Sequence, residues 1–444
     1  MLTEFFDISP TMDLSNVSRH MGTKLQILLP KLACSHSTPV DGIHSIDLSI
    51  AENALIGEAV LVMAKEAVAK SLTLKDLSYP AGVGGDSGLL KALAGFFNTY
   101  FKPSTSVKPE HVIATSGAGN ALDALLSSIC DEGDQVLVLG PCWEGFTPYL
   151  LIHANVEPII VNAPTLEGST QMDIVYALRD VYNTATHPER IKGVVLTNPS
   201  NPLGKCYTVD VLRKILEFCD VNEMHLISDE VYALSRLQNV NCFQPFISAL
   251  SLLDDNLNAN LATLAPRVHV VWSMSKDFGC SGIRLGCIIS QANMAARIGS
   301  GLASYWQISS LASAVAVFML NSPDVPNLIA RNSELLGEAY TILTDGLTKL
   351  AIKYIPADYG LFLFAKVGEH CKTPKDEVEI VKGLKKIGLI VAPGQRFNCG
   401  GQEYGWVRIT FSQPAKMIRT ALIMIETYLG DYYMKREITN MQLL

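Results

Sequence analysis

A single lysine in the segment SMSKDFGCSGIRLG, residues 273–286, is surrounded by residue types that could do covalent chemistry. Lys276 follows the apolar run RVHVVW and stands beside Ser273 and Ser275, with Arg284 eight residues later. A lysine at the end of a buried strand is partly desolvated, which disfavours its ammonium form and leaves a nucleophilic amine. The hydroxyls and the guanidinium charge suit a phosphate dianion. A surface lysine in a loop is the commonest alternative, but it does not explain these phosphate-binding groups.

A glycine-containing segment, SGAGNAL at residues 116–122, follows the apolar run HVIAT. Between a strand and a helix N-terminus, such a loop presents backbone N–H groups and the positive end of the helix dipole to a phosphate. Gly117 and Gly119 also begin a dinucleotide-binding fingerprint, but its third glycine would have to be Leu122. Taken alone, the segment fits a plain tight turn equally well.

Other apolar runs also end in polar or aromatic residues. Asp229 follows HLIS, where a buried carboxylate needs a cation or a donor, although a helix cap or a salt bridge would satisfy it as well. Trp143 follows GPC and could simply belong to the core. Asn198, Asn201 and Pro202 in TNPSNPLG could form only a turn.

Together these groups match the needs of pyridoxal 5′-phosphate. An amine can condense with the cofactor aldehyde, a glycine loop and an arginine can hold its phosphate, and a flat aromatic can stack on its ring. A carboxylate would keep the ring nitrogen protonated, so that the ring accepts electrons from the substrate Cα. The sequence therefore predicts a pyridoxal phosphate enzyme with Lys276 as its nucleophile.

The elements that would position these residues alternate between strands and helices. Short, uniformly apolar strands are expected at 111–115, 135–139, 157–161, 193–197, 225–228 and 268–272. Helices are expected over 119–130 and 208–219. Strands of this kind are buried on both faces, as in an open α/β sheet, where ligands bind beyond the carboxyl ends of the strands.

The last part of the chain has a different pattern. A helix is expected after Thr373–Pro374, with strand-like GLFLF, GLIVA and WVRITFS around it and a further helix over 414–430. We expect these elements to form a second, smaller α+β lobe that begins near residue 325.

Composition limits the classes of protein that the chain can be. Its 444 residues are too many for one ordinary core, and 48% hydrophobic with 18% charged residues describe a well-buried globular protein. A formal charge of −8 disfavours nucleic acid or an anionic membrane as a partner. No apolar run is long enough to span a bilayer, and the N-terminus does not resemble a secretory signal. The ten cysteines form no CxxC pair, so we expect reduced thiols, no metal site and a cytoplasmic protein.

The segments NPSNPLG, SDEVY, SMSKDFGCSGIRLG and WVRITFS follow one another at spacings that resemble the class I and II aminotransferases, pyridoxal phosphate enzymes of fold type I. LSIAENALI at 48–56 resembles the N-terminal motif of 1-aminocyclopropane-1-carboxylate (ACC) synthases, and YPAGVGGD is similar to fungal aminotransferases and carbon–sulfur lyases of secondary metabolism. The resemblance implies an α/β fold whose large domain, residues 49–325, has a mostly parallel, seven-stranded sheet flanked by helices. It also implies a smaller α+β domain, residues 326–444, and an N-terminal arm, residues 1–48, that contributes to the small domain.

The resemblance further implies a role for each matching residue. Lys276 condenses with the cofactor and, once freed by substrate, shuttles the proton at Cα. Asp229 partners the ring nitrogen, Asn201 and Tyr232 hydrogen-bond the ring oxygen, and Trp143 stacks on the ring. The phosphate is held by Gly117, Ala118, Gly119, Ser273, Ser275 and Arg284.

Residues outside this group complete the implied site. Arg408 matches the arginine that binds the substrate α-carboxylate through two parallel hydrogen bonds. Ala51 and Glu52 match substrate-side positions, and whether Glu52 acts on a substrate side chain or only packs at the entrance stays open. Tyr79 matches a tyrosine that reaches the phosphate in the neighbouring subunit, which implies a homodimer. Trp143 stands where plant ACC synthases carry tyrosine, which argues against strict ACC synthase activity.

We therefore expect an enzyme that acts at the Cα of an amino acid or amino-acid-derived substrate, and an aminotransferase first of all. The alternative is a carbon–sulfur lyase or an ACC-synthase-like elimination enzyme, because these reactions share α-proton removal and differ in which atom is held in line. A regulatory domain that senses the cofactor is disfavoured, because no basic patch or DNA-binding module precedes the motifs. A nucleotide-dependent dehydrogenase would not account for Lys276. The expected partners are a small amino-acid-like molecule and a second copy of the chain.

Overall fold

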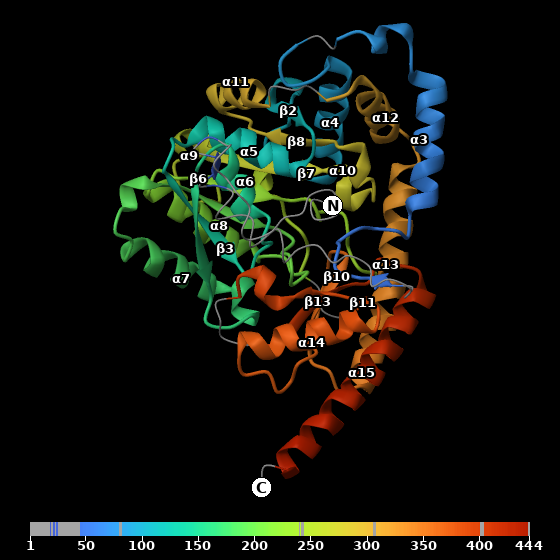
Figure 1. Ribbon diagram of the computed structural model, residues 1–444. Helices are drawn as coiled ribbons and strands as arrows, with labels where there is room; N and C mark the ends of the chain where they lie inside the picture. The colour runs from blue at the N-terminus through green and yellow to red at the C-terminus, as the bar shows by residue number, and fades with distance from the viewer. Residues whose placement is uncertain are drawn as a thin grey trace.

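The computed structural model of this chain describes residues 45–79, 82–238, 244–304, 308–399 and 404–442, with side chains as far as residue 432 and a few isolated positions elsewhere. Most of the predicted N-terminal arm, residues 1–44, lies outside the described residues. The remainder forms a larger lobe and a smaller lobe, one above the other in Figure 1.

A seven-stranded sheet forms the centre of the larger lobe, in the order β2–β8–β7–β6–β5–β3–β4. Its strands are β2 (Val112–Thr115), β3 (Gln135–Gly140), β4 (Glu157–Asn162), β5 (Ile191–Thr197), β6 (His225–Asp229), β7 (Val268–Ser273) and β8 (Gly286–Ile289). Neighbours pair in parallel except β8, which is antiparallel to both β2 and β7. The predicted mostly parallel sheet is confirmed. The sequence pattern did not predict β8, a four-residue strand that directly follows a glycine-rich loop.

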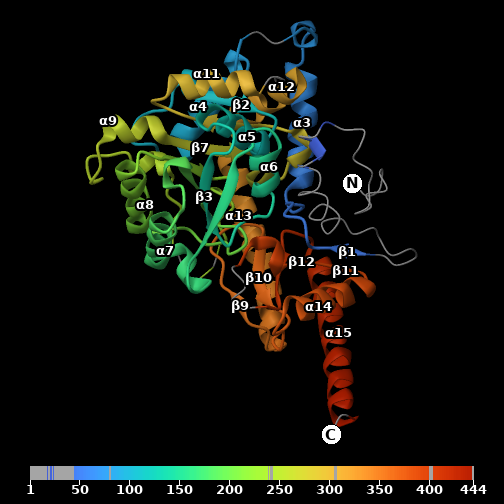
Figure 2. The same cartoon turned by 60° about the vertical axis from the view of Figure 1, so that its left-hand side comes forward.

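Helices pack on both faces of this sheet, as Figures 1 and 2 show. The helices of the larger lobe are α3 (Gly57–Ser71), α4 (Ser87–Tyr100), α5 (Ala118–Ile129), α6 (Phe146–Ile152), α7 (Met172–Asn183), α8 (Val209–Val221), α9 (Leu261–Leu264), α10 (Met274–Asp277), α11 (Met294–Ala303) and α12 (Ser310–Leu320). Helix α4 begins where the sequence predicts, because the Asp86 carboxylate accepts a hydrogen bond of 2.9 Å from the Gly88 N–H.

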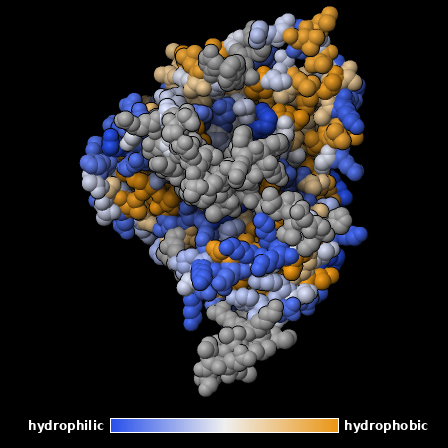
Figure 3. All heavy atoms as spheres, viewed as in Figure 1, coloured by the Kyte–Doolittle hydropathy of each residue, from blue (hydrophilic) through white to orange (hydrophobic). Residues whose placement is uncertain are grey.

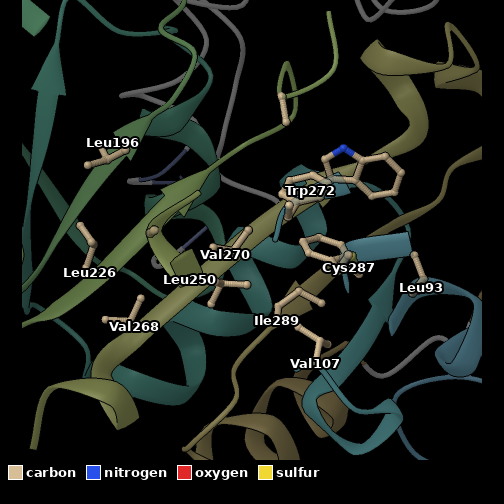
Figure 4. Close-up of a cluster of buried hydrophobic side chains, with 14 of the residues drawn as sticks. Leu93, Val107, Leu196, Leu226, Leu250, Val268, Val270, Trp272, Cys287 and Ile289 are labelled. Carbon is tan, nitrogen blue, oxygen red and sulfur yellow. The ribbon is translucent and has the colours of Figure 1, made fainter. Parts of the chain in front are cut away.

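The strands are apolar throughout because alternate residues enter two different cores. Val138 and Ile227 pack with side chains of α5 and α6 on one face. Leu139 and Leu226 pack with α4, α7, α8 and α12 on the other. Figure 4 shows this second core around Trp272, which is fully buried.

The smaller lobe is built on a four-stranded sheet in the order β12–β13–β10–β9. Its strands are β9 (Tyr354–Ile355), β10 (Phe362–Lys366), β12 (Ala392–Pro393) and β13 (Trp406–Thr410), and its helices are α14 (Pro374–Lys386) and α15 (Ala415–Gln442). The segment GLIVA, expected as one strand, is divided between β12 and β11 (Leu389–Ile390). β11 pairs in parallel with β1 (Ile46–Asp47), so the start of the described chain joins the smaller lobe.

Helix α13 (Val325–Lys349) runs from the larger lobe into the smaller one. Val325 and Leu328 pack in the core of the larger lobe, whereas Leu336 and Leu343 pack in that of the smaller. The proposed domain boundary at residue 325 therefore falls at the start of a helix that serves both lobes, and it remains a prediction. Within the described part of the chain, no helix has both the length and the apolar character that crossing a bilayer needs.

Candidate active site

Lys276 lies in α10, the single helical turn after β7, and its side chain is partly buried. Its Nζ donates a hydrogen bond of 2.6 Å to the backbone oxygen of Ala51. Burial, reinforced by the positive charge of Arg408, lowers the pKa of Lys276 to about 8, while the carboxylates of Glu52 and Asp229 oppose this shift. An amine with such a pKa is uncharged near neutral pH more often than an ordinary lysine, so it can act as a nucleophile and as a base.

Asp229 ends β6, the strand beside β7. Its carboxyl group keeps slight contact with solvent and is otherwise enclosed by protein. This burial raises the pKa of Asp229 to about 7, although the Val231 N–H, which donates to Oδ1 at 3.3 Å, and the charge of Lys276 both act to lower it. A cation placed against this carboxyl would therefore favour its ionised form.

The loop that precedes α5 passes very close to β8. A Cβ on Gly286 would lie 2.6 Å from the carbonyl carbon of Gly117 and 2.9 Å from the nitrogen of Ala118, so only glycine fits there. Gly117 itself has a φ of 101°, which glycine adopts without strain. Because α5 begins at Ala118, the N–H groups of its first turn have no partner inside the helix. This arrangement suits a phosphate.

The positive charge nearest this loop belongs to Arg284. Its guanidinium donates hydrogen bonds of 2.6 Å to the Ser116 oxygen and 2.8 Å to the Ser281 oxygen. Ser273 pairs with Gly286 across β7 and β8, and its hydroxyl lies 2.7 Å from that of Ser275 at the start of α10. The structure thus brings the residues predicted to hold a phosphate around one loop.

Arg408 projects from β13 of the smaller lobe and is only 5% exposed. Its guanidinium donates hydrogen bonds of 2.9 Å to Asn201 Oδ1 and 2.5 Å to the Ser49 oxygen, while its Nε has no hydrogen-bond partner among the described residues. The guanidinium carbon lies 4.8 Å from the ring centre of Phe362 and 4.9 Å from that of Phe397. Burial lowers the pKa of Arg408 to about 10, so the group remains cationic at neutral pH. A buried cation with an unpaired N–H is well suited to a carboxylate.

Trp143 forms an aromatic wall together with Tyr149, which the sequence analysis did not single out. The two ring centres lie 5.7 Å apart. The Trp143 ring folds back over Gly145, where a Cβ would come within 2.2 Å of it, and the Tyr149 ring covers Gly119, where a Cβ would come within 2.5 Å. A side chain at either glycine would therefore displace an aromatic ring of the wall.

The remaining predicted site residues differ in their exposure to solvent. Tyr232 is buried, with its ring centre 5.2 Å from that of Phe362. Glu52 is exposed and accepts a hydrogen bond of 3.1 Å from the Ser281 hydroxyl. Tyr79 is fully exposed, so it is not part of the arrangement around Lys276 within this chain.

Comparison with known proteins identifies the family of this chain. The profile of the family described as aminotransferase class I and II matches residues 44–425. The probable aminotransferase aclI of Aspergillus oryzae is 38% identical over 387 residues, which are 87% of this chain and 91% of that protein. The 1-aminocyclopropane-1-carboxylate synthase of Malus domestica is 30% identical over 349 residues, which are 77% of this chain and 72% of that protein. The chain belongs to the class I and II aminotransferase family.

A solved structure shows the same fold for this aminotransferase-family chain. The aspartate aminotransferase from Thermus thermophilus with maleate matches with a TM-score of 0.75 at 21% identity, covering 94% of this chain and 100% of that one. The expected fold type I architecture is confirmed. Enzymes of this family depend on pyridoxal phosphate and act on amino acids, so this chain is an enzyme of the aminotransferase type.

The residues around Lys276 fit pyridoxal phosphate. The close approach of Gly286 to Gly117 allows the loop before α5 to lie against β8, and Arg284 adds a positive charge beside this loop. Asp229, enclosed but able to ionise, suits a protonated ring nitrogen. These residues would hold the phosphate and the ring of the cofactor.

Sequence reasoning missed the groups that support these residues. Asp277, directly after Lys276, is 4% exposed and accepts three hydrogen bonds. Asn53 Nδ2 donates a hydrogen bond of 2.8 Å to Asn332 Oδ1, which connects the AEN segment to α13. The signal in each case is a polar residue within an apolar setting, and the sequence does not show which partner it meets.

Proposed function

We propose that this chain binds pyridoxal 5′-phosphate through Lys276 and transfers the amino group of an α-amino acid, as a cytoplasmic homodimer. The observation that carries the proposal is the position of Lys276, which is partly buried and follows β7, the neighbour of the strand that ends in Asp229. The charges of Asp229 and Arg408 both act on the pKa of its amine. The groups that we propose as catalytic base, partner of the ring nitrogen and carboxylate-binding residue would thereby act in one place.

Each residue has a distinct task in this proposal. When bound, the cofactor supplies a ring that withdraws electrons from the substrate Cα. Asp229 would keep the ring nitrogen protonated, and Arg408 would bind the α-carboxylate, which orients the Cα–H bond. Lys276 Nζ would then accept the Cα proton, since its lowered pKa lets the free amine form near neutral pH.

Reductive labelling tests the assignment of Lys276. The purified chain, incubated with pyridoxal phosphate and borohydride, should carry one cofactor mass on the peptide that contains Lys276. The Lys276→Ala variant should bind the cofactor without covalent attachment and lose at least about 1,000-fold in kcat, because both the nucleophile and the base are removed. Label on another lysine, or normal turnover by the variant, would refute the proposal.

Asp229→Asn tests the partner of the ring nitrogen separately. Its amide is uncharged, so it would not stabilise the protonated ring. We expect the variant to retain covalent attachment at Lys276 and to lose at least about 100-fold in kcat. A variant with normal turnover would remove Asp229 from the mechanism.

Elimination is the second candidate, favoured by the 30% identity to an ACC synthase. It would use the same proton removal by Lys276 and then expel a leaving group such as sulfur from the substrate side chain. Incubation with amino acids and cysteine conjugates separates the two reactions. Turnover that requires a keto acid indicates amino transfer, whereas release of thiol and ammonia without one indicates elimination. A carbon–sulfur lyase of secondary metabolism would give the second result.

The homodimer is supported by an exposed apolar surface formed by α3 and the following 3₁₀ turn η1 (Leu74–Leu77). Leu74 and Leu77 are 86% and 77% exposed, and Tyr79 beyond them is fully exposed. Figure 3 shows hydrophobic side chains gathered at the upper right, where this segment lies. An apolar surface rimmed by polar groups is typical of an interface. A second copy seated there would receive the Tyr79 side chain.

A further inference from the structure

Glu144 and Arg396 form an ion pair that joins the two lobes. Glu144 follows Trp143 in the turn after β3, whereas Arg396 lies in the 3₁₀ turn η8 (Gly394–Phe397) of the smaller lobe. Both Nε and a terminal nitrogen of the Arg396 guanidinium contact Glu144 Oε1. The side chains of Arg396 and Glu144 are 25% and 26% exposed, so the pair can be reached from solvent.

The backbone on both sides of this pair is fixed. The Cys142 N–H donates a hydrogen bond of 2.8 Å to the Phe397 oxygen, which holds the two turns together. Glu377, only 2% exposed, accepts hydrogen bonds of 2.9 Å from the Gln395 N–H and 2.8 Å from the Gly405 N–H. The pair is therefore held in place by both lobes and is not a chance contact of two long side chains.

The pair is next in the chain to Trp143 of the aromatic wall and to Phe397, a ring that contacts Arg408. Glu144 is next to Trp143 in the chain, and Arg396 is next to Phe397, whose ring centre lies 4.9 Å from the Arg408 guanidinium carbon. The charges of the pair act on the buried Arg408 in opposite directions, since Arg396 lowers its pKa and Glu144 raises it, after the larger effect of burial. A molecule held by Arg408 and stacked near Trp143 would have this pair at its margin.

A small cavity with an uncharged lining is bounded in part by residues that are close in the chain to the pair. It is bounded by Pro141, two residues before Trp143, and by Cys399, three residues after Arg396. The other lining residues lie between Asn162, the last residue of β4, and Ser169, and they carry no charge. An uncharged group would enter this space without the desolvation cost that a charged one incurs.

We propose that Glu144 and Arg396 determine the charge of the substrate side chain: Glu144 neutralises Arg396, so the enzyme accepts α-amino acids whose side chain is uncharged. This inference rests on the proposed function, in which Arg408 binds the α-carboxylate. A second carboxylate on the substrate would meet the Glu144 carboxylate and would have to displace it from Arg396. An ammonium group would meet the guanidinium in the same way. A charged substrate group would thus compete with Glu144 or with Arg396. Its binding is unfavourable because these two side chains already neutralise each other within the protein.

Ligand binding to the cofactor-loaded enzyme tests this inference. The probes are pentanoate and glutarate, which have five carbons and differ in one distal carboxylate, with Kd measured by calorimetry. Wild type should bind glutarate no more tightly than pentanoate. Glu144→Gln keeps the shape of the side chain but removes its charge, which frees the charge of Arg396. It should bind glutarate about tenfold more tightly and pentanoate as wild type does.

A substitution of the other member of the pair, Arg396, gives an independent test. Arg396→Gln leaves Glu144 without its cation, so 5-aminopentanoate, with a distal ammonium, should bind about tenfold more tightly than to wild type. Asp254→Asn is the matched control, because Asp254 is 31% exposed in an ion pair with Arg213 on α8. It should bind pentanoate, glutarate and 5-aminopentanoate with the same Kd values as wild type.

Failure of this inference and failure of the proposed function give different results. If pentanoate binds wild type and both variants equally and neither variant gains affinity for its charged probe, the inference is overturned while carboxylate binding at Arg408 stands. If pentanoate does not bind wild type at all, the proposed role of Arg408 is overturned. A gain in only one variant assigns specificity to one member of the pair and overturns the paired role.

Discussion

The Trp272 indole Nε1 donates a hydrogen bond of 3.0 Å to Asp277 Oδ2, so the residue after Lys276 is anchored to the strand before it. Asp277 Oδ1 accepts hydrogen bonds of 2.7 Å from the Ser235 hydroxyl and 3.1 Å from the Leu234 N–H. One buried carboxyl thereby connects β7, the helical turn of Lys276 and the segment after β6. Lys276 is held by this connection as well as by its own contact with Ala51.

Asp277→Asn should lower the stability of the protein. The amide oxygen can replace one carboxyl oxygen, but the amide NH₂ faces a donor, so at least one buried hydrogen bond is lost. We expect the free energy of unfolding to fall by about 1–3 kcal/mol, measured by denaturant titration. Asp254→Asn, in a partly exposed ion pair, should cost less than about 1 kcal/mol. Equal stability of wild type and Asp277→Asn would show that the buried carboxyl is not an anchor.

Gly286→Ala should weaken the hold on the cofactor phosphate. The new Cβ would meet backbone atoms of Gly117 and Ala118, at 2.6 and 2.9 Å, and neither can rotate away. The loop and β8 must then separate, which changes the direction of the N–H groups at the start of α5. We expect pyridoxal phosphate to bind at least about tenfold more weakly, with a smaller change for pyridoxal, which lacks the phosphate.

Gly282→Ala is the matched control for this change. Gly282 lies in the same loop, but a Cβ there would meet nothing within 4 Å. Its affinity for both compounds should equal that of wild type. A Gly286→Ala protein that binds pyridoxal phosphate normally would mean that the phosphate does not rest on this loop.

Sequence reasoning located the strand ends well because each buried strand is an unbroken apolar run with a glycine, a proline or a polar residue after it. Lys276 and Asp229 are visible in this way, since Asp229 directly follows such a run and Lys276 lies in the short polar segment after another. Arg408 is not, because an arginine in a short strand has no special standing without a resemblance. The pairing of Glu144 with Arg396 joins turns 252 residues apart, and no local pattern connects them.

Helix α15 shows that the end of a helix is also difficult to predict from the sequence. The sequence predicts an end near residue 430, yet the helix continues to Gln442. Gly430 lies within it, and a Cβ there would meet nothing within 4 Å. A glycine inside a helix costs about 1 kcal/mol relative to alanine and does not by itself end the helix. Residues 434–437 (MKRE), a little further on, are good helix formers, which favours continuation of the helix past Gly430.

Charge placed on the exposed apolar surface should prevent dimer formation. Leu77→Asp would bury a carboxylate without a partner in the proposed interface. We expect the variant to have the mass of a monomer in light scattering, at concentrations where wild type is a dimer. Val221→Asp is the control, because Val221 is 80% exposed, close to the 77% of Leu77, and lies at the end of α8. A dimeric Leu77→Asp protein would place the interface elsewhere.

A buried histidine pair should make the protein sensitive to acid. His225 Nδ1 lies 2.9 Å from His269 Nε2, and His269 Nδ1 lies 3.0 Å from the Ser290 hydroxyl. Burial, with the charge of Arg267, lowers the pKa of His225 to about 4, and burial holds that of His269 well below its usual value. In the unfolded chain these histidines have a pKa near 6.5 and bind protons below that pH. In the folded protein both rings are still neutral at the same pH.

The sign of the effect follows from this difference. Between about pH 6.5 and about pH 4 the unfolded chain binds more protons than the folded protein, so the free energy of unfolding falls as the pH falls. Each histidine contributes a slope of up to about 1.4 kcal/mol per pH unit. Replacing both with glutamine should lower stability at neutral pH but remove this slope. The buried carboxyl groups titrate in both proteins, so their effect cancels in the difference between the two curves.

Denaturant titrations across this pH range test the prediction. The stability of wild type relative to the double glutamine variant should decline steadily from about pH 6.5 to about pH 4. His187→Gln is the control, because His187 is 61% exposed and its Nδ1 lies 3.2 Å from Oε1 of Glu189, which is 69% exposed. Its curve should run parallel to that of wild type. If the double variant also runs parallel, the two rings take up their protons in the folded state, and the pair does not set the acid limit of the protein.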